Sequence, residues 1–124
     1  MQKWGLAVPE IDGHVPDAGD VYWIDYGGPM GHEQGGRRPS LVLSPRAYNA
    51  RSSILVTCPI SRTDRRWPFQ VAISPVDRIK GFALVDQLRA LDPLARHVRL
   101  AGAVSDETLR RVRLVLASLL GLGS

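Results

Sequence analysis

Short apolar runs recur along the chain and alternate with polar or glycine- and proline-rich breaks. The runs at 20–26, 39–44, 53–58, 68–73 and 81–86 contain β-branched or aromatic residues. This spacing predicts five strands, and a further strand is predicted near 97–101. The pair Ser44-Pro45 favours a strand end followed by one helical turn over 46–50. Together these elements predict a mostly β protein, built as a small antiparallel barrel with short helices.

The C-terminal segment carries the period of an α-helix. Ser105 is a favourable N-cap, Asp106 and Glu107 place negative charge in the first turn, and Gly121 is placed to end the helix. The apolar positions of this helix recur at helical spacing: Leu109, Val112, Leu116, Leu119 and Leu120. This stripe has to be buried against another part of the molecule or another copy of it.

Length and composition set the domain organisation. A chain of 124 residues with 44% hydrophobic content predicts one globular domain over 16–124, preceded by an N-terminal tail over 1–15. The only cysteine, Cys58, cannot form an intramolecular disulfide, and we expect it to be buried in a strand. No secretory signal is evident, and the apolar stretch 114–122 is shorter than the roughly 20 residues that span a bilayer. A cytoplasmic protein without membrane attachment is predicted.

Charge is distributed unevenly. The net charge is +4, but the first 33 residues hold one lysine against six acids, whereas residues 37–66 hold seven arginines and a single acid, Asp64. This block indicates a phosphate-binding surface. Fourteen of the sixteen basic residues are arginine, whose planar guanidinium binds phosphate bidentately and stacks on bases.

The loop over 31–39 offers the best candidate chemistry. Its sequence, G-H-E-Q-G-G-R-R-P, places the carboxylate of Glu33 near the guanidiniums of Arg37 and Arg38 on a glycine-rich backbone. A lone carboxylate beside a fixed cation suits proton removal while negative charge develops, as in phosphodiester cleavage. A solvated connection between two strands would have the same composition. Metal-ligand spacing is absent, so we expect neither a metal nor a cofactor.

Four segments carry a resemblance to a known family. They are G-D-V-Y-W-I-D-Y at 19–26, R-P-S-L-V-L-S-P at 38–45, P-F-Q-V at 68–71 and V-D-Q-L-R at 85–89. In this order and spacing they resemble the MazF/PemK family of toxin endoribonucleases, over about Pro16 to Leu122. The resemblance implies an SH3-like, CcdB/MazF-like barrel that forms homodimers. Part of the C-terminal helix would then lie in the dimer interface. It also implies metal-independent cleavage of single-stranded RNA at short motifs and inhibition by a cognate acidic antitoxin.

Catalytic positions follow from the same resemblance. Glu33 and Arg38 match the family's E-Q-x-G-x-R-P stretch, and the family's third position, a threonine, aligns best with Ser61. Thr57 and Thr63 are the alternatives for that position. Glu33 would accept the proton of a ribose 2′-OH, whose oxygen attacks the adjacent phosphorus, while Arg38 stabilises the phosphoryl charge. The products would be a 2′,3′-cyclic phosphate and a 5′-OH.

Further residues are predicted to bind RNA. Trp67 follows an arginine-rich loop and can stack on an unpaired base or pack at a barrel edge. His32 adjoins Glu33, but a lone loop histidine is more often simply solvated. The predicted RNA-binding set is Gln34, Arg37, Arg62, Arg65, Arg66, Trp67, Asp86, Gln87 and Arg89.

Two other classes of function stay open at this point. A CcdB-like poison of DNA gyrase shares the implied fold without cleaving nucleic acid. A protein that only binds RNA could keep the same basic surface. The E-Q-x-G-x-R-P loop favours the ribonuclease over both. The cleavage motif and the class of target RNA do not follow from the sequence.

Overall fold

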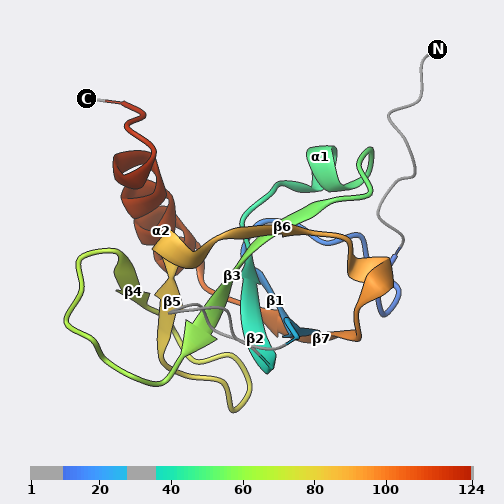
Figure 1. Ribbon diagram of the computed structural model, residues 1–124, viewed down its shortest axis with the longest axis horizontal. Coiled ribbons are helices and arrows are strands. Elements are labelled where there is room, and N and C mark those ends of the chain that lie inside the picture. The colour runs from blue at the N-terminus through green and yellow to red at the C-terminus, as the bar shows by residue number, and fades with distance from the viewer. Residues whose placement is uncertain (1–9, 28–35, 124) are drawn as a thin grey trace.

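Seven strands form one curved antiparallel sheet in the computed structural model, which describes residues 10–27 and 36–123 (Figure 1). The strand order is β4-β5-β3-β2-β1-β7, and β6 also pairs with β3. The strands are β1 (Asp20–Asp25), β2 (Arg37–Val42), β3 (Leu55–Ser61), β4 (Gln70–Ala72), β5 (Phe82–Leu84), β6 (Arg89–Leu91) and β7 (Val98–Ala103). The helices are α1 (Arg46–Asn49) and α2 (Asp106–Leu119), with 3-10 turns η1 (Val85–Gln87) and η2 (Pro93–Ala95).

Strand β3 is the central element of the sheet. One of its edges pairs with β2, and the other pairs first with β6, over Leu55 to Thr57, and then with β5, over Ile60 and Ser61. Pro59 lies between these two pairings. Since proline has no N–H to donate, it is tolerated where β3 passes from one partner to the next.

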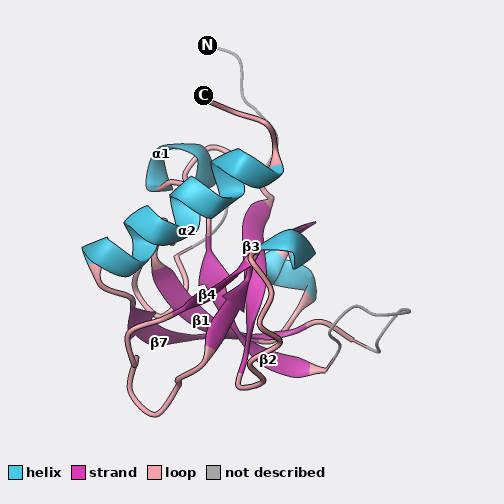
Figure 2. Cartoon of the chain, turned by 90° about the vertical axis from the view of Figure 1, so that its left-hand side faces the viewer, coloured by secondary structure: helices cyan, strands magenta, loops and turns pink. Residues whose placement is uncertain are grey.

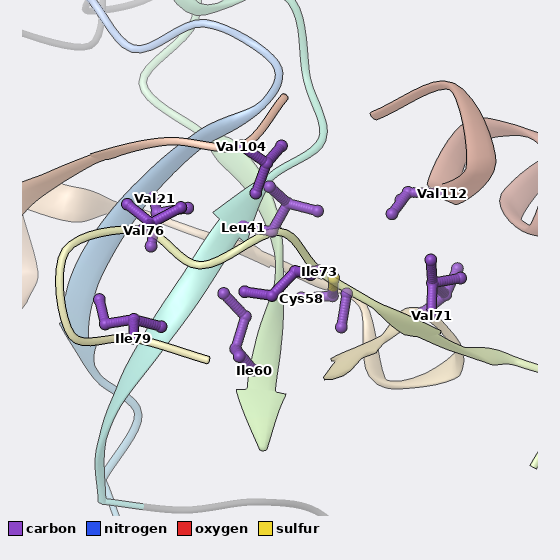
Figure 3. Close-up of a cluster of buried hydrophobic side chains, with 12 residues drawn as sticks. Val21, Leu41, Cys58, Ile60, Val71, Ile73, Val76, Ile79, Val104 and Val112 are labelled. Atoms are coloured by element: carbon purple, nitrogen blue, oxygen red, sulfur yellow. The ribbon is translucent and has the colours of Figure 1, made fainter. Parts of the chain in front are cut away.

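Alternating residues of the strands fill two apolar cores on opposite faces of the sheet. Val21, Leu41 and Cys58 belong to the larger core, between the sheet and α2 (Figure 3). Tyr22 and Ile24 belong to the smaller core on the other face. The period of two along β1 therefore places consecutive side chains in different cores.

Helix α2 crosses one side of the sheet (Figure 2). The Ser105 hydroxyl accepts a hydrogen bond from the Thr108 N–H at 3.1 Å, as the N-cap prediction requires. Val112 is fully buried, and Leu109, Leu116 and Leu119 pack against the larger core. Leu120, which the helical pattern placed on the same stripe, is mostly exposed.

The predicted elements are largely confirmed. All six predicted strands, the helical turn after Pro45 and the C-terminal helix are present, with bounds shifted by a few residues. Two details differ. Residues 85–87, at and just past the end of a predicted strand, form a 3-10 turn, and β6 was not predicted. The sheet curves like a barrel wall, but among the described strands its two end strands, β4 and β7, do not pair.

The described part of the N-terminal tail is tied to the domain. The Leu100 N–H donates to the Asp12 carboxylate at 2.7 Å, and at the first residue of the domain the Asn49 side chain donates to the Pro16 carbonyl at 2.8 Å. His14 Nε2 and a carboxylate oxygen of Asp20 lie 2.6 Å apart, within hydrogen-bond distance. Among the described helices, none is long and apolar enough to cross a bilayer.

Candidate active site

The ends of β2 and β3 bring Arg38 and Ser61 to one place. Ser40 pairs with Pro59, and continuing this antiparallel register by two residues places Arg38 opposite Ser61. Both residues line a hollow of about 520 Å³ at this end of the sheet. A cation and a hydroxyl predicted from separate sequence segments therefore share one site.

The hydroxyl of Ser61 is oriented by its own loop. Its oxygen accepts a hydrogen bond from the Thr63 N–H at 3.2 Å, and the residue is 6% exposed at the edge of the hollow. Because the oxygen is already an acceptor, the hydroxyl proton is available for a phosphoryl oxygen. Thr57, by contrast, is fully buried and bonds the Tyr26 hydroxyl at 3.1 Å. Of the two alternatives for this position, only Thr63 lines the hollow.

Residues 31–35 of the predicted catalytic loop, which include His32, Glu33 and Gln34, lie outside the described residues. The base of that loop is described. The Tyr26 N–H donates to the Gly36 carbonyl at 2.9 Å, and Gly36 also donates to Gly27. Gly27 and Gly36 have φ of +75° and +73°, which glycine adopts without strain. The two ends of the loop are thus joined directly beside Arg37 and Arg38.

The hollow is strongly cationic. Its lining includes one carboxylate, Asp77, and six cations: Arg37, Arg38, Arg62, Arg78, Lys80 and Arg99. Trp23 lies among them, and the Arg37 guanidinium lies 5.8 Å from the centre of its ring. A low-dielectric wall beside several clustered cations attracts polyanions. Of the predicted RNA-binding residues, Arg37 and Arg62 line this hollow.

Other predicted RNA-binding residues are placed outside the hollow. The Trp67 indole N–H donates to the Asp86 carboxylate at 2.9 Å, and the ring is 48% exposed. Arg89 lies over Tyr26, with its guanidinium 5.0 Å from the ring centre. The remaining members of this group, placed near the same loop and turn, are Arg65, Arg66 and Gln87.

Arg78, Lys80 and Arg99 were not selected from the sequence. They are distant along the chain from the arginine block at 37–66, and only the folding of the sheet brings them to β2. Trp23 also lines the hollow, although its position in the middle of β1 indicates only a core or interface residue. The cluster D-R-I-K at 77–80 was the one available signal, a charged turn between two apolar runs.

Burial raises the pKa of two side chains near the site, Tyr26 and Cys58. Burial raises the pKa of Tyr26, and hydrogen bonds to Ser40 and Thr57 offset this only in part. Burial, reinforced by Asp86, raises the pKa of the Cys58 thiol to about 12, so Cys58 is not a nucleophile at neutral pH. Within the part of the chain that the structure describes, no three His, Cys, Asp or Glu side chains gather to hold a metal.

Comparisons with known proteins agree with one another. Residues 17–120 match the family model of the PemK-like, MazF-like toxin of type II toxin-antitoxin systems. The endoribonuclease toxin MazF of Escherichia coli K12 is 34% identical over 111 residues, which cover 90% of this chain and 99% of that protein. The endoribonuclease toxin ChpB of E. coli K12 is 33% identical over 105 residues, which cover 81% of this chain and 90% of that protein.

Solved structures of MazF proteins also resemble this chain. The crystal structure of MazF from Deinococcus radiodurans is 39% identical with a TM-score of 0.80, covering 88% of this chain and 99% of that one. The MazE-MazF structure from the same organism has 36% identity and a TM-score of 0.76, covering 89% of this chain and 100% of the matched one.

Proposed function

Because the chain belongs to the PemK-like, MazF-like toxin family of type II toxin-antitoxin systems, we propose that it is an endoribonuclease that cuts single-stranded RNA without a metal ion. The observation that carries this proposal is the shared position of Arg38 and Ser61 in a cationic hollow, next to the base of the loop that holds Glu33. Matched relatives are named as endoribonucleases, which does not favour a CcdB-like gyrase poison.

The reaction uses the nucleophile of the substrate itself. Glu33 takes the proton of a ribose 2′-OH, the 2′-oxygen forms a bond to the adjacent phosphorus, and the bond from phosphorus to the 5′-oxygen breaks. Arg38 and the Ser61 hydroxyl stabilise the negative charge on the non-bridging oxygens. The leaving 5′-oxygen takes up a proton, which gives a 2′,3′-cyclic phosphate and a 5′-OH. No external water has to be activated in this step.

The substrate is single-stranded for a geometric reason. An A-form duplex holds the 2′-OH out of line with the leaving 5′-oxygen, whereas a flexible strand can rotate into line. The hollow also suits an unpaired strand, because its cations contact phosphates and Trp23 offers an aromatic surface. Cleavage at a short sequence motif is the expected specificity.

A cognate acidic antitoxin is the proposed regulator. Relatives of this chain have been solved as MazE-MazF complexes and as an endoribonuclease with its cognate antitoxin. An acidic, partly disordered segment would be attracted to the cationic hollow and would exclude RNA from it. We further propose that the toxin is a homodimer.

The direct test is cleavage of a long single-stranded RNA in EDTA, with fragment ends mapped. Wild-type protein should cut at one short motif and leave cyclic phosphate ends. Glu33→Ala and Arg38→Ala should each lower the rate by about 10² or more, as expected for a lost base or charge donor. Arg110→Ala, at an exposed arginine of α2 outside both the hollow and the arginine block at 37–66, is the control and should cut normally.

Two outcomes would contradict the proposal. Absence of cleavage on RNAs covering all short motifs would reject the nuclease, and stabilised gyrase–DNA cleavage complexes would then favour the gyrase poison. Cleavage that leaves 3′-OH ends would instead reject attack by the 2′-OH.

A further inference from the structure

We propose that the turn over 76–81 and strand β7 form a second phosphate-binding subsite. In it, Arg78, Lys80 and Arg99 hold the RNA backbone beside the scissile phosphate. This inference rests on the proposed ribonuclease function and adds a substrate-positioning surface to it. Four observations carry it: the rigidity of the turn, its fixed position relative to Ser61, the charge around the hollow, and the continuity of the hollow.

The turn that carries Arg78 and Lys80 is anchored in the core. Val76 and Ile79 exchange two backbone hydrogen bonds, of 2.9 and 2.8 Å, across a two-residue turn. Both side chains are almost fully buried in the larger core (Figure 3). The charged side chains therefore extend from a fixed backbone, which lowers the entropy lost when they bind a phosphate.

Two glycines set the position of this turn. A Cβ atom on Gly81, whose φ is +135°, would overlap the carbonyl oxygen of Ser61. A Cβ atom on Gly102 of β7 would lie 2.7 Å from the Val76 side chain. Glycine at both positions lets the turn approach β7 at one end and the third catalytic position at the other. The turn and Ser61 are thus held as one unit.

The charge of this surface is not neutralised by ion pairs within residues 10–27 and 36–123. Arg78, Lys80 and Arg99 form no ion pair with any described residue, and Asp77 is the one described carboxylate that lines the hollow. Clustered cations without partners raise the local concentration of a polyanion. Their energetic cost to the folded state is expected to be recovered on binding.

RNA is the occupant that the continuity of the hollow favours. The same cavity is lined by Arg38 and Ser61, so a strand whose scissile phosphate lies there continues directly toward Arg78 and Arg99. Consecutive phosphates repeat along such a strand, and Lys and Arg side chains at fixed positions match that repeat. These contacts would position the strand without reading its bases.

The experiment compares Arg78→Ala/Lys80→Ala and Arg99→Ala with wild type. The control is Arg110→Ala/Arg111→Ala, which removes two exposed arginines of α2 that lie outside both the hollow and the arginine block at 37–66. Cleavage kinetics on a long RNA give KM and kcat. RNA affinity is measured against salt concentration in a Glu33→Gln background, so that the RNA stays intact. Thermal unfolding checks that each variant is folded.

The subsite predicts a higher KM with nearly unchanged kcat, because the contacts are equally present in the bound substrate and the transition state. The salt dependence of affinity should weaken by about 0.7 in log–log slope for each RNA phosphate that no longer has a cationic partner. Arg78→Lys, which keeps the positive charge, should show the KM and the salt slope of wild type. The control pair should leave KM and slope near wild type.

The inference is overturned if wild type cuts RNA but the Arg78/Lys80 and Arg99 variants keep its KM and salt slope. It is also overturned if those variants bind RNA normally and lose affinity only for an acidic peptide, which would make the surface an antitoxin site. Failure of wild type to cut any RNA would instead reject the proposed function, so the two failures are distinguishable.

Discussion

Ser61 is the proposed match to the family's threonine, and its hydroxyl is the group that the proposed reaction uses. Ser61→Thr keeps that hydroxyl and should retain activity within a few-fold. Ser61→Ala removes a donor to the phosphoryl oxygens and should lower kcat by about 10², with RNA affinity nearly unchanged. Single-turnover cleavage and a binding assay separate the two effects. Thr63→Ala is the control, and a larger loss there than at Ser61 would move the catalytic hydroxyl to Thr63.

Cys58 and the buried tyrosines make the fold sensitive to alkali. The folded protein keeps the Cys58 proton up to a pKa of about 12, whereas the unfolded thiol loses it near the ordinary value of 9.0. Its contribution to stability is therefore complete below pH 9 and lost as pH rises toward 12, by about 1.4 kcal/mol per pH unit. Burial also raises the pKa of Tyr22 and of Tyr26, so both add to this loss above pH 10.

Urea unfolding at pH 8, 9 and 10 measures this effect. We expect the free energy of unfolding to fall between pH 9 and 10, and the fall to be smaller in Cys58→Ala. Only the slopes are compared, because removing the sulfur also leaves a small cavity. Equal slopes in the two proteins would show that the thiol titrates freely in the folded state.

The loop between β3 and β4 presents Trp67 to solvent, and η1 fixes its orientation through Asp86. We predict that the exposed ring stacks on an RNA base. Trp67→Ala should weaken RNA binding by about 1–3 kcal/mol, which is roughly 5- to 150-fold. Trp67→Phe keeps a stacking surface and should lose much less. Tyr48→Ala, an exposed aromatic of α1, is the control and should bind as wild type.

Asp86 is a positioning residue in this interpretation. Asp86→Asn retains an acceptor for the indole N–H, whereas Asp86→Ala frees the ring. Only the alanine variant should broaden the set of motifs that are cut, as read from mapped fragment ends. An unchanged motif set in both Trp67→Ala and Asp86→Ala would exclude the ring from base recognition.

The elements differ in how well the sequence predicts them, for physical reasons. Apolar runs with β-branched or aromatic residues predict β1, β2 and β3 because β1 and β3 are buried along most of their length and β2 along its second half. Strand β6 consists of three residues, Arg-Ala-Leu, too few to show alternation, and it exists only because it pairs with β3. The cap at Ser105 is local chemistry and was predictable.

The candidate site divides in the same way. Arg38 follows from the E-Q-x-G-x-R-P stretch, and Ser61 from an alignment that also allowed Thr57 or Thr63. Arg78, Lys80 and Arg99 belong to the site only through tertiary packing, namely the core anchoring of Val76 and the close approaches at Gly81 and Gly102. No periodicity or charge run in the sequence encodes those approaches.

Three leucines in and just after α2 are exposed on the surface of the single chain. Leu114 of α2 is 59% exposed, and Leu120 and Leu122, just past its end, are 53% and 62% exposed. The inner side of the same helix packs against the core, so these outer side chains are available to another surface. A second copy of the chain is the partner that the proposed homodimer supplies.

We therefore predict a dimer at micromolar concentration that α2 helps to form. Leu114→Asp/Leu120→Asp should shift the mass measured by light scattering from dimer to monomer, because burying two carboxylates in an interface is strongly unfavourable. Leu94→Asp, at an equally exposed leucine of η2, should leave the dimer intact. Circular dichroism would show whether the monomer stays folded. A wild-type monomer, or equal dissociation by Leu94→Asp, would remove α2 from the interface, and the exposed leucines would then need another explanation.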